Sequence, residues 1–497
     1  MTTWRDRLPL VSAEELAGLP PSVRARLETL EHLLDLTLAH VEELNRLRGL
    51  LEERVARLEE RVGTNSSNSS KPPSSNGPSA PPASRPGPSG RPKGGQKGHK
   101  GHRRELLSPE KVDTVVPCKP VACGDCGHAL EGDDPEPLRH QVIELPEKLA
   151  HVTEFQIHAL TCACCGSSTR GALPPEAPTT MLGPRGQALL GALVGQFKMS
   201  HRDVVMFFTT VLGVTMSAGT VARMLFRVSE AVAASVEAAK VAARQQAVAH
   251  ADETSWRRGR RKGWLWVMAT AVATFFEVAA DRGGESAAQL VIEFKGILVV
   301  DRWSAYDVLG VKAWQYCWAH LKRDWEKFRL RGGVDADLAE RLARETDRLF
   351  DWWHWVKQGR RDRAWLQRSV ARLKRTFRRL LEEGVETASS KTRGTCGELL
   401  ATFERMWTFV DHEGVPPTNN FAEQQIRHGV IWRKTSYGSD SPRGCLFAGR
   451  ILTVVATCRQ HARSVFAFLC DAVISTLRGL AAPSLIPLEL LSNGVGG

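Results

Sequence analysis

AVAHAD (247–252) and GILVVD (296–301) are the two stretches that decide the predicted fold. Each is a run of small or apolar residues that ends in an aspartate, and such short runs are typical of buried strands. An apolar stretch with the texture of two adjacent strands and a short helical pattern separate them, and a strand-like segment, WQYCWAH (314–320), follows. This order predicts a mixed α/β sheet.

The phase of the two strands predicts that Asp252 and Asp301 approach each other at adjacent strand ends. Side chains alternate along a strand, so Asp252 shares a face with His250, and Asp301 shares a face with Val299. The order of elements fits the mixed sheet of ribonuclease-H-like nucleases, in which the first and fourth strands lie side by side. We therefore predict a ribonuclease-H-like catalytic domain over residues 245–475.

A third carboxylate, Glu423, lies near the start of a helical segment, NNFAEQQIR (419–427). Carboxylate oxygens suit Mg²⁺, and two ions about 3.5–4 Å apart can hold the attacking and leaving oxygens of a phosphodiester. We predict that Asp252, Asp301 and Glu423 bind these ions and are the catalytic residues. On a basic chain, such a site indicates an enzyme that cuts and joins nucleic acid.

Each of the three carboxylates also has a structural interpretation. An aspartate after a strand commonly caps a turn, and Glu423 lies three residues after Asn420, the spacing of a capping box. Three other carboxylates could compete for the metal role: Glu253, Asp307 and Asp324.

The composition favours a polyanionic partner. The 497 residues include 67 Lys and Arg against 55 Asp and Glu, which gives a net charge of +12. Nucleic acid is the usual partner of such a chain, and solubility alone is the other interpretation. The predicted DNA contacts near Glu423 are Arg427, Arg433 and Lys434.

Neither a secretory signal nor a membrane span is expected. The N-terminus, MTTWRDRLPL, has no apolar signal core. The apolar stretch over 264–280 is short for a span, and its aromatic and β-branched residues predict two buried strands instead. We expect a cytoplasmic protein without a membrane partner.

Six of the eleven cysteines lie between residues 118 and 165, which favours metal ligation over a disulfide framework. Two Cys-x-x-Cys pairs can direct four thiolates at one Zn²⁺, so we predict a structural, zinc-ribbon-like module over 106–175. The segment between the pairs, with HQVIEL (140–145) and VTEFQIHAL (152–160), is expected to return as strands, and a redox role is the alternative. The predicted ligands are Cys123, Cys126, Cys162 and Cys165, with Cys118 and Cys164 as possible replacements.

Residues 27–62 carry apolar side chains at alternating steps of three and four, which predicts a coiled coil within an N-terminal helical region, 1–62. We expect it to mediate self-association, and packing against the chain's own domain is the alternative. Residues 63–105 are predicted to be a flexible, basic linker, because residues 63–104 are rich in Gly, Pro and Ser and contain no Asp or Glu. In it, Lys97 and Lys100 are predicted phosphate contacts.

Residues 180–240 are predicted to be helical and DNA-binding. A helix, a Gly-Val turn and a second helix starting near Ala218, with Ser217 as its cap, resemble a helix-turn-helix, although an ordinary helical hairpin fits equally well. A mostly helical segment over about 332–410 is predicted to be an insertion in the catalytic domain. It includes a basic amphipathic helix near 359–381, predicted to be a DNA contact or a solvated face, and residues 476–497 form a C-terminal tail.

The segment YCWAHLKR (316–323) contains Cys317 and His320, which could bind a metal but are more commonly packing and surface groups at this spacing. We expect His320 or Lys322 to contact phosphate or the catalytic site instead.

The chain resembles the insertion sequence 66 family of DDE transposases, transposase C type. The similar blocks occur in one order over residues 27–490: NSSNSSKPPSS (65–75), GGQKGHKGH (94–102), the paired Cys-x-x-Cys, VVDRWSAYD (299–307), CWAHLKRD (317–324), NNFAEQQIRHGVIWRKTSYGSDSPRG (419–444) and IPLELLSNG (486–494). The segment EQQIRHGVIWRKTSYG differs from the sequence more common in that family, ERAIRPVVIGRKNWLF, which indicates a subgroup. The difference concerns DNA-end specificity and not the chemistry.

The resemblance implies that Asp252 in HADET, Asp301 in VVDRW and Glu423 in NNFAEQQIR form a catalytic triad that uses Mg²⁺ or Mn²⁺. It also implies cleavage and strand transfer at the terminal inverted repeats of an insertion sequence, double-stranded target DNA, accessory transposition proteins, and action at the bacterial nucleoid. The alternatives are a domesticated, non-catalytic DNA-binding protein and a metal-dependent nuclease without joining activity.

Overall fold

The computed structural model describes residues 13–63, 106–175, 177–307 and 309–492. The predicted contacts Lys97 and Lys100 lie outside these residues, as does nearly all of the predicted linker, 63–105. The chain divides into two compact units, Met1–Ala83 and Ser84–Gly497, which we describe separately.

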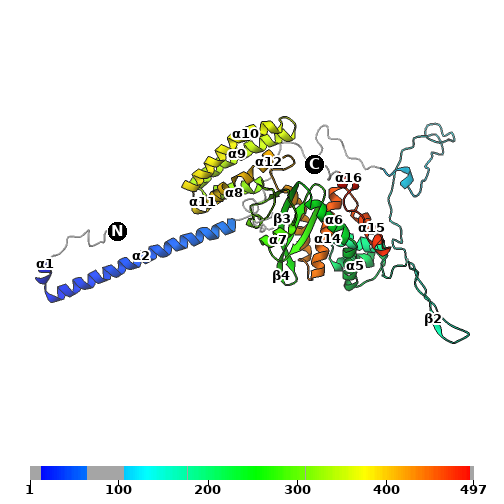
Figure 1. Cartoon of the computed structure of the whole chain (residues 1–497), viewed down its shortest axis with the longest axis horizontal. Helices are drawn as coiled ribbons and strands as arrows, with labels where there is room; N and C mark the ends of the chain where they lie inside the picture. The colour runs from blue at the N-terminus through cyan, green and yellow to red at the C-terminus, as the bar shows by residue number, and fades with distance from the viewer. Residues whose placement is uncertain (1–12, 64–105, 176, 308, 493–497) are drawn as a thin grey trace. The chain divides into compact units, whose positions relative to one another are not determined.

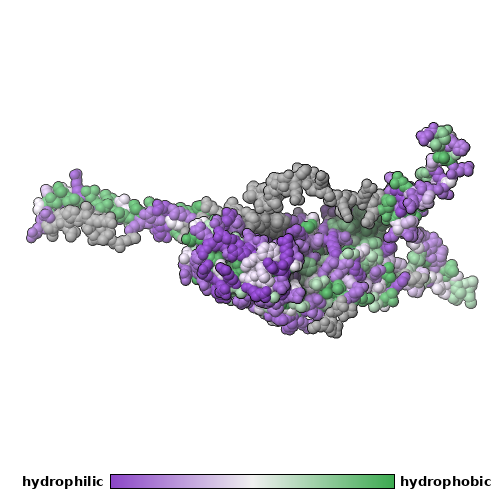
Figure 2. Space-filling model, turned by 90° about the horizontal axis from the view of Figure 1, so that it is seen from above, coloured by the Kyte–Doolittle hydropathy of each residue, from purple (hydrophilic) through white to green (hydrophobic). Residues whose placement is uncertain are grey.

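The first unit contains α1 (Ala13–Ala17) and one long helix, α2 (Pro21–Gly63). The predicted heptad seam lies on α2, and its side chains are exposed; Leu30, Leu44 and Leu51 are each more than 60% exposed. Hydrophobic and hydrophilic residues both show on the surface of this helix (Figure 2). Because α2 spans the whole seam, the predicted continuous helix is confirmed.

In the second unit, residues 106–175 contain little regular structure: η3 (Pro109–Lys111), β1 (Ala159–Thr161) and β2 (Ser168–Arg170). β1 and β2 pair antiparallel. The strands predicted over 140–145 and over most of 152–160 are wrong. The apolar side chains there, including Val142 at 79% and Val152 at 71%, are exposed, so their alternation buries no face.

Four helices precede the sheet: α3 (Pro184–Gly195), α4 (His201–Leu212), α5 (Ala218–Ala231) and α6 (Ala233–Arg244). Gly213 ends α4 in the left-handed conformation, where glycine avoids a Cβ clash. The Ser217 side chain accepts a hydrogen bond from the Thr220 N–H and starts α5. The predicted helix, turn and Ser-capped helix are confirmed.

The central sheet has five strands in the order β5-β4-β3-β6-β7. β3 pairs antiparallel with β4 and parallel with β6, so the first and fourth strands are neighbours, as predicted. The apolar stretch over 264–280 lies within the β4–β5 hairpin, also as predicted. The strands are β3 (Val248–Arg258), β4 (Arg261–Ala269), β5 (Thr274–Ala279), β6 (Ile297–Val300) and β7 (Ala313–Tyr316), with α7 (Gly284–Leu290) before β6 and η4 (Ser304–Tyr306) before β7.

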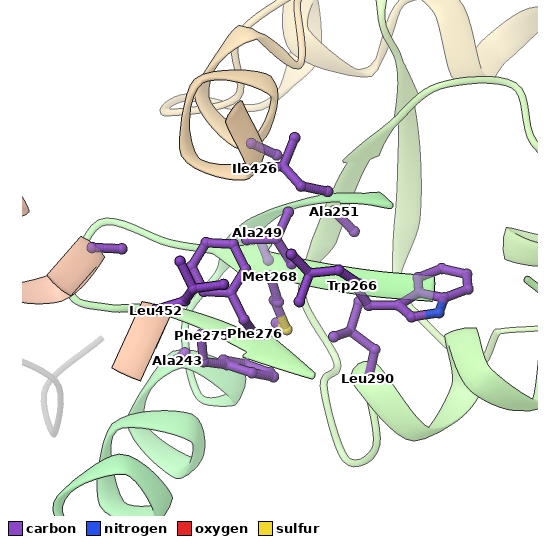
Figure 3. Packing of buried hydrophobic residues seen from close by; sticks show 14 of the residues in the cluster. Ala243, Ala249, Ala251, Trp266, Met268, Phe275, Phe276, Leu290, Ile426 and Leu452 are labelled. Atoms are coloured by element: carbon purple, nitrogen blue, oxygen red, sulfur yellow. The ribbon is translucent and has the colours of Figure 1, made fainter. Parts of the chain in front are cut away.

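Helices cover both faces of this sheet (Figures 1 and 3). On one side are α13 (Asn420–Ser436) and α14 (Pro442–Gln460), which bring Ile426 and Leu452 onto the strands. On the other are α6 and α7, from which Ala243 and Leu290 point to the sheet. All four side chains belong to one buried hydrophobic cluster, so the sheet is the centre of the core.

A helical insertion lies between β7 and α13 in the chain, and its helices are grouped together in Figure 1. The side chains predicted to form the apolar face of its basic helix are buried, namely Leu366, Val370, Leu373, Phe377 and Leu380. The two ends of the insertion meet, because the Trp318 N–H donates to the Pro417 carbonyl at 2.9 Å. The elements are α8 (Trp318–Arg331), α9 (Gly333–Lys357), α10 (Arg363–Thr387), α11 (Ser390–Ala401), η5 (Phe403–Met406) and α12 (Thr408–Asp411).

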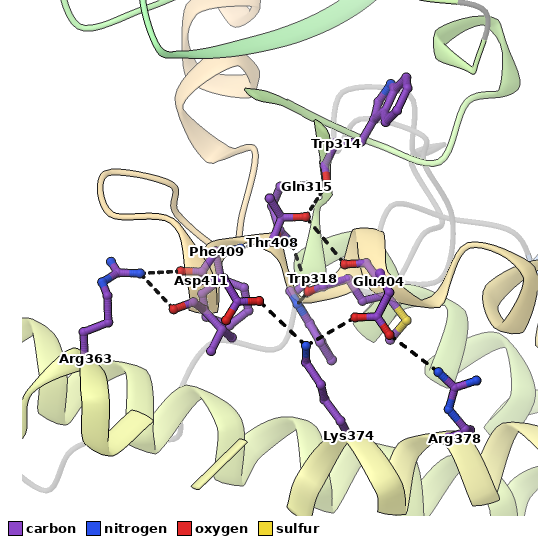
Figure 4. A network of polar contacts seen from close by, with 12 residues as sticks. Trp314, Gln315, Trp318, Arg363, Lys374, Arg378, Glu404, Thr408, Phe409 and Asp411 are labelled. Carbon is purple, nitrogen blue, oxygen red and sulfur yellow. Dashed lines mark hydrogen bonds and ion pairs between the residues drawn. The ribbon is translucent and has the colours of Figure 1, made fainter. Parts of the chain in front are cut away.

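Several cations of α10 bind groups of the chain itself (Figure 4). Lys374 lies 3.3 Å from Glu404, and Arg378 pairs with the same carboxylate at 3.5 Å. Arg363 donates to the carbonyl of Phe409 at 2.8 Å. These contacts support an intramolecular role for this part of the basic helix, rather than contact with DNA.

The chain continues through α15 (Val465–Leu477) and α16 (Leu488–Ser492). No helix among the described residues is long and apolar enough to cross a membrane.

The close packing of α14 on β5 yields a stability prediction. A Cβ added at Gly449 would lie 2.9 Å from the Phe276 carbonyl oxygen, a backbone atom that cannot turn aside. We expect Gly449→Ala to lower the free energy of unfolding by about 1–3 kcal/mol, measured by urea denaturation. Gly394→Ala is the control, because a Cβ there meets no atom within 4 Å and should stabilise α11. Equal stability of Gly449→Ala and the wild type would contradict this packing.

Candidate functional site

Asp252 and Asp301 lie beside each other on neighbouring strands. The parallel register pairs His250 with Val299, and each aspartate follows its member of this pair by two residues, so both side chains leave the same face. Asp301 directly follows β6, as predicted. Asp252 is not at a strand end, because β3 continues to Arg258 through its pairing with β4. Asp252 lies two residues after His250, the last residue of β3 that pairs with β6.

Glu423 lies in the first turn of α13, on the same side of the sheet. The capping-box interpretation of Glu423 is wrong, because the N-cap is Asn419 and no side-chain cap hydrogen bond is present. Glu423 directs one oxygen, Oε1, towards His320 Nδ1 at 3.6 Å and the other, Oε2, towards Arg323 at 3.7 Å.

The pKa of the Asp252 carboxyl is strongly affected by its surroundings. Burial raises the pKa of the Asp252 carboxyl well above its usual range, and the charges of Glu253, Asp301 and Glu423 raise it further. The opposing effect is a hydrogen bond from the Glu253 backbone N–H, at 2.9 Å. Asp301 similarly accepts one from the Trp303 N–H at 2.9 Å. The three predicted residues are therefore close enough to repel one another.

The competing carboxylates are each matched by cations. Glu253 lies 2.5 Å from Arg282 and accepts a hydrogen bond from the Tyr306 hydroxyl at 2.5 Å. Asp324 pairs with Arg302 at 2.7 Å and with Lys327 at 2.8 Å.

Asp307, the third competitor, pairs with Arg405. In contrast, neither Asp252 nor Asp301 forms an ion pair within the described part of the chain. Two uncompensated carboxylates on one face, with Glu423 opposite, form a set of hard oxygen donors that suits Mg²⁺ or Mn²⁺.

Asn419 fixes the start of α13 on β3, a role that the sequence did not indicate. Its side-chain amide donates to the Ala251 carbonyl at 2.7 Å, and its Oδ1 lies 3.1 Å from His250 Nδ1. Burial lowers the pKa of His250 to about 4, so this imidazole is neutral and donates. These bonds hold Glu423 over the strand that carries Asp252. The pair Asn419-Asn420 is typical of a helix start, but the sequence does not show which strand these residues contact.

Cys317 and His320 also lie at this site. Cys317 is the N-cap of α8, and its buried Sγ accepts the Asn419 N–H at 3.1 Å. Burial raises the pKa of this thiol to about 12. Among the described residues, Cys317, His320 and Glu423 are the one group of at least three ligand atoms that all lie within 4.8 Å of one another.

The predicted contacts with DNA divide into two groups. Arg427 and Lys434 are exposed on α13. Arg433 instead faces inward and donates to the Ser255 carbonyl at 2.7 Å, so it holds α13 against β3. Lys322 pairs with Asp347 at 2.7 Å, so of the two residues it is His320 that lies beside Glu423.

The two predicted zinc-binding pairs form matching turns. In the first, the Gly127 N–H donates to the Cys123 carbonyl at 2.9 Å, and in the second Gly166 bonds to Cys162 at the same distance. Both glycines have positive φ. Hydrogen bonds from Ser167 lower the pKa of Cys165 to about 7.

The four sulfurs of these pairs, from Cys123, Cys126, Cys162 and Cys165, do not form a single cluster of ligand atoms within 4.8 Å in the structure as described. A joint zinc site therefore stays a prediction.

Comparison with known proteins places this site in a family. A curated relative, the uncharacterized protein y4qI of Sinorhizobium fredii (strain NBRC 101917 / NGR234), is 25% identical over 261 residues, which are 47% of this chain and 48% of that protein. The chain thus spans about half the length of the relative it matches. Residues 21–105 match a family of unknown function, DUF6444. Residues 201–446, which carry all three carboxylates, match the Transposase IS66 family, and the chain belongs to this family.

Proposed function

We propose that this chain is a metal-dependent DNA transposase whose catalytic domain, over about 245–475, has a ribonuclease-H-like fold. The strand order β5-β4-β3-β6-β7, with an antiparallel hairpin on one side of β3 and parallel strands on the other, supports that fold. Family membership supports a transposase role, and the basic charge fits a DNA substrate.

The observation that carries the proposal is the uncompensated repulsion at Asp252. Burial and the charges of Glu253, Asp301 and Glu423 raise the pKa of its carboxyl, and Asp252 forms no ion pair among the described residues, whereas Glu253 and Asp324 pair with arginines or lysines. A site that serves only the fold gains nothing from such repulsion, whereas a site for divalent cations requires it.

In the proposed site, Asp252, Asp301 and Glu423 would be the protein ligands of the metal ions. Bound there, Mg²⁺ or Mn²⁺ would activate water and neutralise charge that develops on the phosphodiester. Asn419 and Arg433 keep α13, and with it Glu423, in place on β3. The proposed reaction is hydrolysis at an element end, followed by attack of the freed 3′-hydroxyl on target DNA.

The other regions would bind and arrange DNA. We propose that residues 106–175 form a structural Zn²⁺ module, supported by the matching turns at Cys123 and Cys162. The helical region 180–240 and exposed Arg427 and Lys434 would contact the terminal inverted repeats, and the linker 63–105 would contact phosphates. The α2 seam would pair protomers, and accessory transposition proteins would complete the assembly.

Loss of any one carboxylate should abolish catalysis. We expect Asp252→Asn, Asp301→Asn and Glu423→Gln each to slow Mg²⁺-dependent cleavage of labelled element ends by about 100-fold or more. Asp307→Asn is the matched control, because Arg405 already pairs with that carboxylate away from the metal site. Unchanged cleavage by Asp301→Asn would refute the assignment of the site.

The same assay separates the alternatives. Binding of element ends without cleavage by the wild type would favour a non-catalytic DNA-binding protein. Cleavage without strand transfer would favour a nuclease that does not join.

The raised pKa of Asp252 predicts a stability effect without DNA. A carboxyl whose pKa is higher in the folded chain contributes stability at low pH, and this contribution is lost as the pH rises from the usual aspartate range towards the folded pKa. At neutral pH, Asp252→Asn should therefore stabilise the metal-free protein by about 1 kcal/mol or more. Thermal unfolding would measure this, and added Mg²⁺ should stabilise the wild type more than the variant.

Asp324→Asn provides the opposite control for that experiment. Its carboxylate pairs with Arg302 and Lys327, so its removal takes the ion-pair partner from Lys327 and the nearer of two carboxylates from Arg302, and should destabilise the chain. Destabilisation by Asp252→Asn would show that its charge is compensated.

The exposed seam of α2 predicts self-association. Leu44 and Leu51 are each more than 60% exposed, and a partner helix would bury them. We expect Leu44→Lys with Leu51→Lys to shift the full chain to smaller species in analytical ultracentrifugation. Lysines at the exposed positions Glu42 and Asn45, which lie outside the seam, are the control and should preserve association. A monomeric wild type at all concentrations would contradict the coiled coil.

A further inference from the structure

We propose that Cys317, His320 and Glu423 form a second metal site, selective for a borderline divalent ion such as Zn²⁺. This site would share Glu423 with the proposed catalytic triad. Zn²⁺ bound there would withdraw Glu423 from Asp252 and Asp301, so it would inhibit Mg²⁺-dependent cleavage. The inhibitory role rests on the proposed function, whereas the metal site itself does not.

Two helix N-termini bring the three ligands together. Cys317 is the N-cap of α8 and His320 lies one turn further along, so both side chains reach the same side of that helix. Glu423 comes from the first turn of α13. Its Oε1 lies 4.0 Å from Cys317 Sγ and 3.6 Å from His320 Nδ1. These separations are somewhat wider than those around a bound ion, and small side-chain rotations would close them.

His320 Nδ1 is a buried nitrogen without a hydrogen-bond partner. Among the described residues, only two buried side-chain atoms lack one, His320 Nδ1 and Trp407 Nε1. An unsatisfied buried polar atom costs about 1–3 kcal/mol. A metal on Nδ1 would satisfy it, because a neutral imidazole nitrogen is a common ligand of divalent ions.

The ligand types select the ion. A thiolate, an imidazole and one carboxylate oxygen suit Zn²⁺, whereas Mg²⁺ prefers an all-oxygen shell. The ion would displace the Cys317 thiol proton to solvent. The resulting thiolate is favoured by the Asn419 N–H, which already points at Sγ. Three protein ligands leave one tetrahedral position for water.

The two oxygens of Glu423 face different partners, and this explains how a Zn²⁺ ion would compete with the Mg²⁺ site for the same carboxylate. Oε1 faces Cys317 and His320, and Oε2 lies 3.7 Å from Arg323. A Zn²⁺ ion on Oε1 would therefore hold this carboxylate towards α8. Asp252 and Asp301 would then share their metal ions without the third ligand.

Cobalt substitution of the full-length protein tests the site without DNA. Co²⁺ bound to a thiolate gives an intense charge-transfer absorption, and the cysteine pairs at 123–126 and 162–165 contribute equally to every variant. We expect the wild type to bind one Co²⁺ equivalent more than Cys317→Ser, with the corresponding additional absorption. Cys396→Ser is the matched control, because this buried thiol lies in α11 and should leave cobalt binding unchanged.

His320→Gln provides a second variant if Cys317→Ser does not fold. It should lose the same Co²⁺ equivalent, as measured by equilibrium dialysis. Equal cobalt binding and absorption by the folded variants and the wild type would overturn the proposal.

Two further measurements separate this site from the catalytic one. Asp252→Asn with Asp301→Asn should retain the additional Co²⁺ equivalent, because neither residue is a ligand here. In cleavage assays with Mg²⁺, Cys317→Ser should need about tenfold more Zn²⁺, or more, for half-inhibition than Cys396→Ser. Failure of cleavage in all proteins would refute the proposed function but leave the cobalt result standing, and loss of cobalt binding in Asp252→Asn with Asp301→Asn would overturn the separate site.

Discussion

The parallel pairing of β3 with β6 is the constraint on which the rest of the site depends. Val248 pairs with Ile297 and His250 with Val299, and this register puts Asp252 and Asp301 on one face. A slip of one residue would turn the β6 side chains to the opposite face, towards α7. The register is secured by burial, because every side chain of β6 is buried and a slip would expose or displace them all.

Around these aspartates, the neighbouring carboxylates Glu253, Asp307 and Asp324 each pair with a cation. Arg282 and Tyr306 occupy the oxygens of Glu253, which faces the other side of β3 from Asp252. Tyr306 lies just after Asp301, so this bond also holds the Asp301 loop against β3. The same two contacts therefore occupy the Glu253 carboxylate and connect the loop after β6 to β3.

Sequence periodicity predicted the parts of the fold that depend on local burial. The shared face of Asp252 and Asp301, the cap at Ser217 and the apolar face of α10 follow from side-chain spacing and were confirmed. Long-range polar contacts have no such period. The inward turn of Arg433 towards Ser255 and the bond from Asn419 to Ala251 join residues more than 160 positions apart. Alternation also failed over 140–145, where no partner strand gives it a face to bury.

The hydrogen bond between Trp318 and Pro417 closes the neck of the helical insertion. About a hundred residues leave and re-enter the core through one short opening, and the cost of closing such a loop grows only slowly with its length. Evolution could therefore lengthen, shorten or exchange α9–α12 while α8 and α13 stay in position. The insertion is a region in which related chains could diverge in shape and specificity while keeping the same chemical centre.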